Sequence, residues 1–340
     1  MRSWAVKRRG AAILWRFCLA IALSSCGGIS GSAAPPDHVK AVVLPFLSVV
    51  PFHIAAQEGY FAEQNLEVEF IRLGRDQEIM TSLARGEVDV ATGMLTLGEL
   101  TEMARGVQVR LIASLSRLAP DGCAFAAVVA RRELVESGAL NDAEQIRGLR
   151  FDANVLIPHG YWLEQLLRPL GVKLDELAMS DLPPPASIAA LIGGATDVSV
   201  LSEPHLSMIL ESAEVGIWQR VDEIVPGYAF SVVKYGPTIL EQRREVGERF
   251  AVAMLKAIRQ FNLGKTPRNL ELAASFTGLS RAQVEAACWA PTTDDARIDP
   301  SVFRGYQEWN VKRGLLDRVL ADDELFDRRF IDHANAVLDR

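Results

Sequence analysis

Alternating apolar and polar residues define a strand–helix–strand unit near the start of the chain. The apolar run Ala41–Phe46 predicts a buried strand. Pro51 favours the first turn of a helix, where a missing N–H costs nothing, and Gly59 is a suitable helix end. From Leu66 to Phe70 apolar residues alternate with glutamates, which predicts a half-buried strand. The loop and helix start of such a unit lie at the edge of a parallel sheet, where open α/β sheets hold ligands.

Two similar phrases stand about a hundred residues apart, at 82–90 and 190–198. In each, a helical segment ends at a glycine, and an aspartate three residues later (Asp89, Asp197) opens an apolar strand. One such phrase is common in any α/β protein. Two of them, each closing a βαβ unit, predict two α/β lobes with a sheet in each.

The predicted organisation assigns residues 38–120 and 234–340 to a first lobe and residues 121–233 to a second. Apolar strands at Cys123–Val129 and Tyr228–Val233 are expected to form the two crossings between the lobes. Helical segments follow the return crossing, from about residue 245 to residue 338.

Several of these motifs resemble one known family. The segments 50–61 and 65–70, the phrase Leu83–Ala91, the phrase Gly194–Val198 and the element Ser202–Pro204 are similar to those of periplasmic solute-binding proteins of ABC importers. The group in question handles nitrate, sulfonates, taurine and thiamine pyrimidine precursors, and the resemblance covers about residues 40–320. It implies a type II periplasmic-binding-protein fold, an α/β fold of two lobes. Each lobe would be a mainly parallel sheet flanked by helices, with two crossings between lobes.

The same resemblance implies a non-enzymatic function without a cofactor. The ligand would be a small molecule, either a sulfonate, a nitrate-like anion or a pyrimidine-type heterocycle, bound between the lobes by a monomer and delivered to an ABC permease and its ATPase. One alternative is a pyrimidine-precursor synthase on the same fold, which would need a lysine-bound pyridoxal phosphate. The expected cleft segments contain no lysine, which argues against that enzyme. Another alternative is a ligand sensor that docks on a receptor.

The first 25 residues have the pattern of a bacterial lipoprotein signal peptide. A basic start is followed by the apolar stretch Ala11–Ala22 and by Leu23-Ser24-Ser25-Cys26. A membrane-spanning helix would need about 20 uninterrupted apolar residues, and Arg16 interrupts this run. We therefore expect lipidation of Cys26, a flexible tether over residues 26–37, and a lipid-anchored protein in the periplasm or at the cell surface. Secretion without a lipid is the alternative.

The net charge argues against one class of partner. Residues 1–25 contain five basic and no acidic residues, so their removal changes the net charge from −7 to −12. Such an acidic body argues against binding to nucleic acid. It does not determine the charge of the ligand, because the field inside a cleft can oppose the net charge.

Two cysteines remain in the expected mature chain, Cys123 and Cys288. Outside the cytoplasm they could form a disulfide, but two cysteines so far apart in sequence are also compatible with two separate buried thiols. The sequence leaves both possibilities open.

Six segments are expected to line the cleft, because each follows a predicted strand or opens a helix: 47–53, 92–95, 114–117, 156–162, 201–205 and 226–230. Helix starts there would direct N–H groups at a ligand. The candidate ligand-binding residues in these segments are Phe52, His53, Thr92, Gly93, Met94, Ser114, His159, Gly160, Tyr161, Glu203 and Tyr228.

Several of these candidates have alternative interpretations. The aromatic residues could form flat walls of the cleft or belong to the core. Glu203 could touch the ligand or brace a helix. His53, His159 and His205 are expected to be polar lining, and no metal site is expected because their spacing matches no metal motif. Arg117 is the only basic residue in the six segments, and the aromatic and histidine content favours a flat heterocycle such as a pyrimidine.

Overall fold

The computed structural model describes residues 34–73, 76–120 and 122–340, and residues 36–340 form one compact unit. The expected signal segment and the expected lipidation site, Cys26, lie outside the described residues. Among the residues that are described, no helix is both long enough and apolar enough to cross a membrane.

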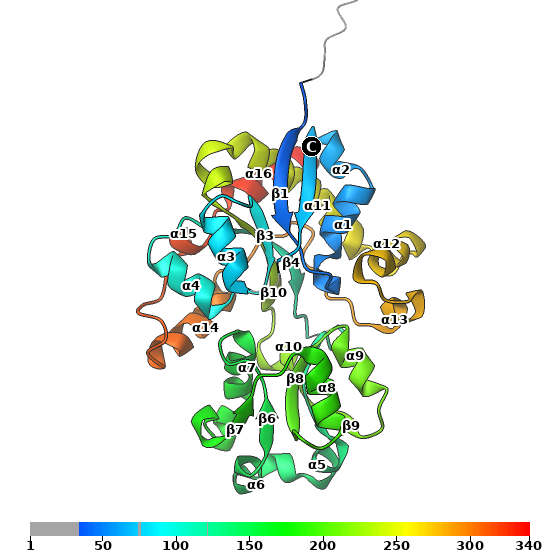
Figure 1. The fold of residues 1–340 in the computed structure, drawn as a ribbon, viewed down its shortest axis with the longest axis vertical. Helices are drawn as coiled ribbons and strands as arrows, with labels where there is room; N and C mark the ends of the chain where they lie inside the picture. The colour runs from blue at the N-terminus through cyan, green and yellow to red at the C-terminus, as the bar shows by residue number, and fades with distance from the viewer. Residues whose placement is uncertain (1–33, 74–75, 121) are drawn as a thin grey trace, which may run out of the picture. The chain divides into compact units, whose positions relative to one another are not determined.

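Two five-stranded sheets organise residues 36–340 (Figure 1). The first has the strand order β2-β1-β3-β10-β4, with β1 (Asp37–Val42), β2 (Leu66–Ile71), β3 (Val90–Gly93), β4 (Arg110–Arg117) and β10 (Ala229–Tyr235). The second has the order β7-β6-β8-β5-β9, with β5 (Ala126–Arg131), β6 (Arg150–Asp152), β7 (Ala178–Ser180), β8 (Val198–Ser202) and β9 (Val215–Arg220).

Each sheet is parallel except where a strand arrives from a crossing. In the first sheet β10 runs antiparallel to both β3 and β4, and in the second β5 runs antiparallel to both β8 and β9. The two mainly parallel sheets confirm the fold class expected from the sequence. The strand β10 belongs entirely to the first sheet, whereas the sequence assigned residues up to 233 to the second lobe.

Helices flank both sheets (Figure 1). The first lobe contains α1 (Val50–Gln57), α2 (Tyr60–Glu63), α3 (Asp76–Ala84), α4 (Leu97–Ala104), α11 (Arg244–Asn262), α12 (Pro267–Thr277), α13 (Arg281–Ala286), α14 (Ser301–Lys312), α15 (Asp322–Leu325) and α16 (Arg329–Leu338). The second contains α5 (Arg132–Ser137), α6 (Ala143–Arg147), α7 (Pro158–Leu167), α8 (Pro184–Ile192), α9 (His205–Leu210) and α10 (Val221–Ile224).

The first strand and its helix illustrate how the sequence sets the elements. β1 pairs with β2 from Asp37 to Val42, earlier than the expected Ala41–Phe46, because the chain leaves the sheet after Val42 to reach the start of α1. Pro51 lies in the first turn of α1, as expected. Gly59, the expected end of that helix, is left-handed with φ of 77° and separates α1 from α2.

The two glycine–aspartate phrases occupy equivalent places in the two sheets. The Asp89 carboxylate accepts the backbone N–H of Lys40 in β1 at 2.9 Å, and the Asp197 carboxylate accepts the backbone N–H of Arg150 in β6 at 2.9 Å. The glycine that precedes each aspartate by three residues is left-handed, with φ of 69° and 70°. Each aspartate therefore satisfies a backbone donor of a neighbouring strand, within β1 in the first sheet and at the first residue of β6 in the second.

We expect Asp197→Asn to lower the free energy of unfolding by about 1.5–3 kcal/mol near pH 7, the usual range for hydrogen bonds to a charged group. Asp197 also binds the side chains of Arg150 and Arg131. Burial raises the pKa of this carboxyl, but the hydrogen bonds and charges of the arginines more than offset it, so its pKa lies below the ordinary value.

The sign of the pH dependence follows from that lowered pKa. The stabilisation by Asp197 is complete above the unfolded-state pKa of about 3.9 and is lost as pH falls through the lower, folded-state pKa. Urea unfolding of the protein and of Asp197→Asn should therefore differ most at neutral pH and converge in acid. Asp175→Asn, at an exposed position, is the matched control. Equal stability of the two proteins at pH 7 would contradict the assignment.

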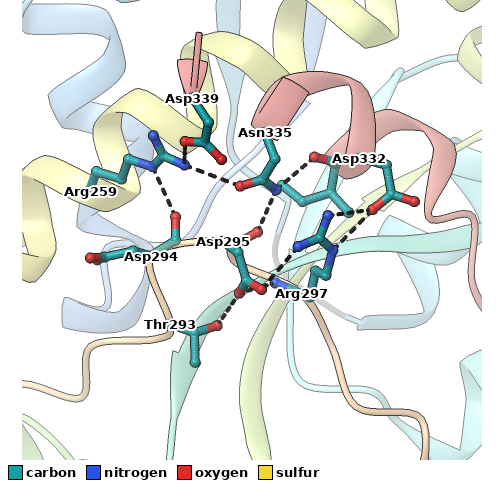
Figure 2. A network of polar contacts seen from close by, with 9 residues as sticks. Arg259, Thr293, Asp294, Asp295, Arg297, Asp332, Asn335 and Asp339 are labelled. Carbon is teal, nitrogen blue, oxygen red and sulfur yellow. Dashed lines mark hydrogen bonds and ion pairs between the residues drawn. The ribbon is translucent and has the colours of Figure 1, made fainter. Parts of the chain in front are cut away.

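A polar network holds the segment before α14 against the last helix of the chain (Figure 2). Arg259 of α11 donates to the carbonyl of Asp294 and to the side chains of Asn335 and Asp339 in and after α16. Asn335 in turn donates to the carbonyl of Asp295. These contacts fix residues 292–297 to the first lobe, just after the segment that contains Cys288.

Candidate functional site

A cavity of about 350 Å³ lies where strands of both sheets end, and we call it the central cavity. From the first lobe it is lined by residues that follow β1, by the end of β3, and by α3, α4 and β10: Leu44, Phe46, Ser48, Val49, Ile79, Thr92, Gly93, Met94, Thr96, Glu99, Phe230, Ser231 and Lys234. From the second lobe it is lined by residues at the starts of α7, α8 and α9 and at the end of β8: Ile157, His159, Pro184, Ser202, Glu203 and His205.

Two further hollows adjoin the central cavity. One, which we call the α8 cavity, has a volume of about 320 Å³, includes Asp152 and Asp181, and shares Ile157, His159 and Pro184 with the central cavity. The other has a volume of about 480 Å³ and lies beside α3 and α4. A hollow of about 570 Å³ beside α15 is larger, but it is lined mainly by charged side chains and is not at the strand ends.

Five of the sequence-predicted site residues line the central cavity: Thr92, Gly93, Met94, His159 and Glu203. The first three occupy the end of β3 and the residue after it. His159 lies in the first turn of α7, and Glu203 follows β8 directly. All five thus occupy the strand ends and helix starts from which they were predicted.

Two predicted residues on α1 do not line the central cavity. Phe52 is fully buried and packs against aromatic rings of β2 and α11, with centroids 6.4 and 5.9 Å away. His53 faces α12, where its ring stacks on Phe276 and its Nε2 lies 3.0 Å from the hydroxyl of Ser275. The helix begins at Val50, so both side chains point to neighbouring helices of the first lobe.

Gly160 and Tyr161 face the helix α14. A Cβ at Gly160 would lie 2.8 Å from the backbone of Val155 and 3.1 Å from the ring of Trp309, so only glycine fits there. The Tyr161 ring lies 5.9 Å from Tyr306 and 6.0 Å from Trp309. Both residues help to pack α7 against α14 and do not line the central cavity.

Tyr228 and Ser114 are also outside the cavity lining. Tyr228 is 1% exposed and packs edge-on against Trp162 and Phe303, in the core behind His159. Ser114 is buried in β4 and accepts a hydrogen bond from Thr292 at 2.8 Å.

His159 lines the central cavity and contains a buried polar atom without a described partner. Its Nε2 is buried and has no hydrogen-bond partner among the described residues. Burial lowers the pKa of this imidazole to about 4, an effect that the Asp152 carboxylate only partly opposes. The ring is therefore neutral at pH 7 and can exchange a hydrogen bond with a bound molecule.

A histidine with so low a pKa makes stability depend on pH. Between about pH 6.5 and pH 4 the unfolded chain binds a proton at His159 that the folded chain does not. The free energy of unfolding should therefore decrease as the pH is lowered over this range, by on the order of 3 kcal/mol. We expect His159→Gln to lose less stability over this range in urea unfolding. The exposed His333, replaced by Gln, is the control. Parallel pH profiles for the protein and His159→Gln would refute this expectation.

Glu203 is a buried carboxylate at the cavity wall, 3% exposed. One oxygen accepts the Ser207 hydroxyl at 2.6 Å and the Cys288 N–H at 2.9 Å, and the other accepts the Ser207 N–H at 3.2 Å. Burial raises the pKa of this carboxyl, and the same hydrogen bonds partly oppose the rise. Glu203 thus braces α9 and also lines the cavity, so both of its expected roles are geometrically available.

The sequence did not predict an ion pair that lines the same cavity. Lys234 of β10 donates to the Glu99 carboxylate at 2.5 Å and to the Met94 carbonyl at 2.7 Å, and its side chain is 2% exposed. The other carboxylate oxygen of Glu99 accepts the N–H of Thr96 and closes a capping box at the start of α4. The available signal was a single charged side chain in the otherwise uncharged strand Ala229–Tyr235.

Possible metal ligands, the side chains of His, Cys, Asp and Glu, occur in the ranges 34–73, 76–120 and 122–340. These ranges contain no group of three or more such side chains arranged to hold a metal ion. His159 and His205 line the central cavity with Glu203, whereas His53 faces α12.

A disulfide joins Cys123 to Cys288, across 165 residues of sequence, which answers the question that the sequence left open. Cys123 lies in the crossing from β4 to β5, and Cys288 follows α13. The Cys288 N–H also donates to Glu203, and this hydrogen bond connects the segment after α13 to the second lobe beside the cavity.

Solved structures with a similar fold have different functions. A ligand-binding component of an ABC-type import system from Staphylococcus aureus, with zinc bound, is 15% identical, covers 88% of this chain and 99% of its own, and has a TM-score of 0.71. The periplasmic aliphatic sulphonate-binding protein SsuA from Escherichia coli is 13% identical, with coverages of 87% and 99% and a TM-score of 0.69. The desulfurization enzyme DSZB is 14% identical, with coverages of 88% and 99% and a TM-score of 0.64.

At such low identities these structures show a shared fold and do not identify a shared ligand. No curated protein sequence matches the chain. The NMT1-like family matches residues 32–277, which include most of both lobes. This match agrees with the resemblance seen in the strand–helix–strand unit and the glycine–aspartate phrases. The chain therefore belongs to the NMT1-like family.

Proposed function

We propose that this protein is the substrate-binding component of an ABC importer, which binds a small molecule between its lobes and delivers it to a membrane permease. The observation that carries the proposal is the central cavity, about 350 Å³ in volume and lined by strand ends and helix starts of both lobes. A ligand there contacts both lobes at once, so its binding favours a closed form that a permease can distinguish from an open one. Membership of the NMT1-like family supports this function.

The proposal includes a periplasmic location, anchoring through a lipid on Cys26, and action as a monomer. The disulfide supports a site outside the cytoplasm, because disulfides persist in oxidising compartments and are rare in the cytosol. Metabolic labelling with a clickable fatty acid should mark the full-length protein but not Cys26→Ala. Equal labelling of both would remove the lipid anchor from the proposal.

Two measurements test substrate binding itself. Mass spectrometry of the purified protein under native conditions should detect a small molecule that is released on denaturation. Adding that molecule back to refolded, ligand-free protein should decrease the radius of gyration measured by small-angle X-ray scattering. Identical scattering of the free and loaded protein, or chemical conversion of the bound molecule during incubation, would contradict the proposal.

An enzymatic function is the second candidate, since the enzyme DSZB has a similar fold and the cavity does contain a lysine, Lys234. The six cleft segments expected from the sequence contain no lysine, because Lys234 lies in β10 beyond the last of them, 226–230. A lysine that forms a Schiff base needs a free amine, but the Lys234 amine already binds Glu99 and Met94. Incubation with pyridoxal phosphate should leave no aldimine absorbance after dialysis, whereas a retained aldimine band would favour the enzyme.

A further inference from the structure

Negative side chains outnumber positive ones around the central and α8 cavities. Of the described residues that line them, Lys234 is the only lysine or arginine, and it is neutralised by Glu99. Three carboxylates remain, from Glu203, Asp152 and Asp181, and none of them forms an ion pair with a described residue.

The other polar groups at these cavities do not offset that charge. Burial lowers the pKa of both His159 and His205, so neither ring carries a positive charge at pH 7. The helices α7, α8 and α9 begin at the cavities, but a helix N-terminus contributes only about half a positive charge. Three such termini supply about one and a half units against three carboxylates.

Glu203 has the position and the free capacity to bind a positively charged group. It is 3% exposed, and its second oxygen accepts a single hydrogen bond, from the Ser207 N–H, so an acceptor position remains. Burial disfavours the charged form of this carboxyl and raises its pKa, and its hydrogen bonds and the charge of Lys265 oppose that rise only in part. A ligand cation beside it would reduce the remaining desolvation penalty. An anion beside it would instead be repelled, and the low dielectric constant of the buried site strengthens that repulsion.

An unsatisfied ring nitrogen and apolar side chains complete the surroundings. His159 lines both cavities, and its buried Nε2 lacks a hydrogen-bond partner among the described residues. Phe46, Met94 and Phe230 supply apolar surface in the central cavity. The lining therefore suits a compact molecule with an apolar body and a polar, positively charged end.

We propose that the ligand is a small organic cation with an ammonium, amidinium or guanidinium group that lies against the Glu203 carboxylate. This assignment rests on the proposed function, because it takes the central cavity as the ligand site. It differs from what the name of the sulphonate-binding neighbour would suggest, since a sulphonate is an anion. The apolar part of the ligand would contact Phe46, Met94 and Phe230.

Three probes of nearly equal size test the charge: benzamidinium, benzamide and benzenesulfonate. We expect benzamidinium to raise the melting temperature and to bind in calorimetry at low salt and pH 7.5, whereas benzenesulfonate should do neither. Glu203→Gln should weaken benzamidinium binding at least tenfold. Glu69→Gln, at an exposed position of β2, should leave it unchanged. Asp181→Asn, at the exposed rim of the α8 cavity, should weaken it by a smaller factor and does not disturb the buried contacts of Glu203.

Each other outcome counts against the charge assignment. Binding of benzenesulfonate in preference to benzamidinium, no response to benzamidinium, or benzamidinium binding that both Glu203→Gln and Asp181→Asn leave unchanged would overturn it. A co-purified sulfonate that compacts the protein would overturn the assignment and leave the transport function intact. A cation that binds without compaction, and is converted, would instead contradict transport.

Discussion

Replacing Lys234 by methionine is expected to lower the free energy of unfolding by about 3–5 kcal/mol, the cost of leaving a buried charge without its partner. The Glu99 carboxylate would remain at 4% exposure in the cavity wall, still held by the capping box of α4. Chemical denaturation near pH 7 measures the change. Lys173→Met, at an exposed position, should have little effect.

The double variant Lys234→Met with Glu99→Gln separates the charge from the packing. Glutamine keeps an acceptor for the N–H of Thr96 but carries no charge, so much of the lost stability should return. If the double variant is as unstable as Lys234→Met, the loss comes from the lysine's packing and its bond to Met94, and the ion-pair explanation is wrong.

Replacing both Cys123 and Cys288 by serine is expected to lower the free energy of unfolding by about 2–5 kcal/mol. The effect should be near the upper end of this range, because the bond closes a loop of 165 residues and thus restricts the unfolded chain strongly. Thermal unfolding with and without reductant measures it. Reductant should destabilise the native protein to the level of the double variant and leave the variant itself unaffected.

The same disulfide variant should also weaken ligand binding, because the Cys288 N–H that donates to Glu203 would be held less firmly. Single substitutions would leave a free thiol, so the double variant is the informative one. A double variant that unfolds at the same temperature as the native protein under oxidising conditions would contradict the stabilising role.

Much of the fold was accessible from sequence, because the signals that define it are local. Apolar alternation at Leu66–Phe70, the proline at position 51 and the two glycine–aspartate phrases each depend on a few neighbouring residues. The limits of the strands were less accessible. β10 joins the first sheet because its backbone pairs with β3 and β4, and such distant pairing leaves no local pattern.

The site residues were also predictable only where a local pattern places them. Residues placed by a strand end, such as Thr92 and Glu203, line the central cavity. Residues placed by the orientation of a helix, such as Phe52 and Tyr161, face neighbouring helices, because one position along a helix turns a side chain by about 100°. Lys234 was missed because its burial depends on Glu99, more than a hundred residues earlier in the chain.

The repeated aspartates allow the two halves of the molecule to be compared within one experiment. Asp89 has one arginine nearby, Arg243 at 3.7 Å, whereas Asp197 binds both Arg150 and Arg131. The aspartate of the second sheet thus has more positively charged neighbours than the aspartate of the first. Higher salt or lower pH should therefore increase the rate of amide hydrogen exchange in β6 more than in β1. The comparison would show which sheet unfolds first.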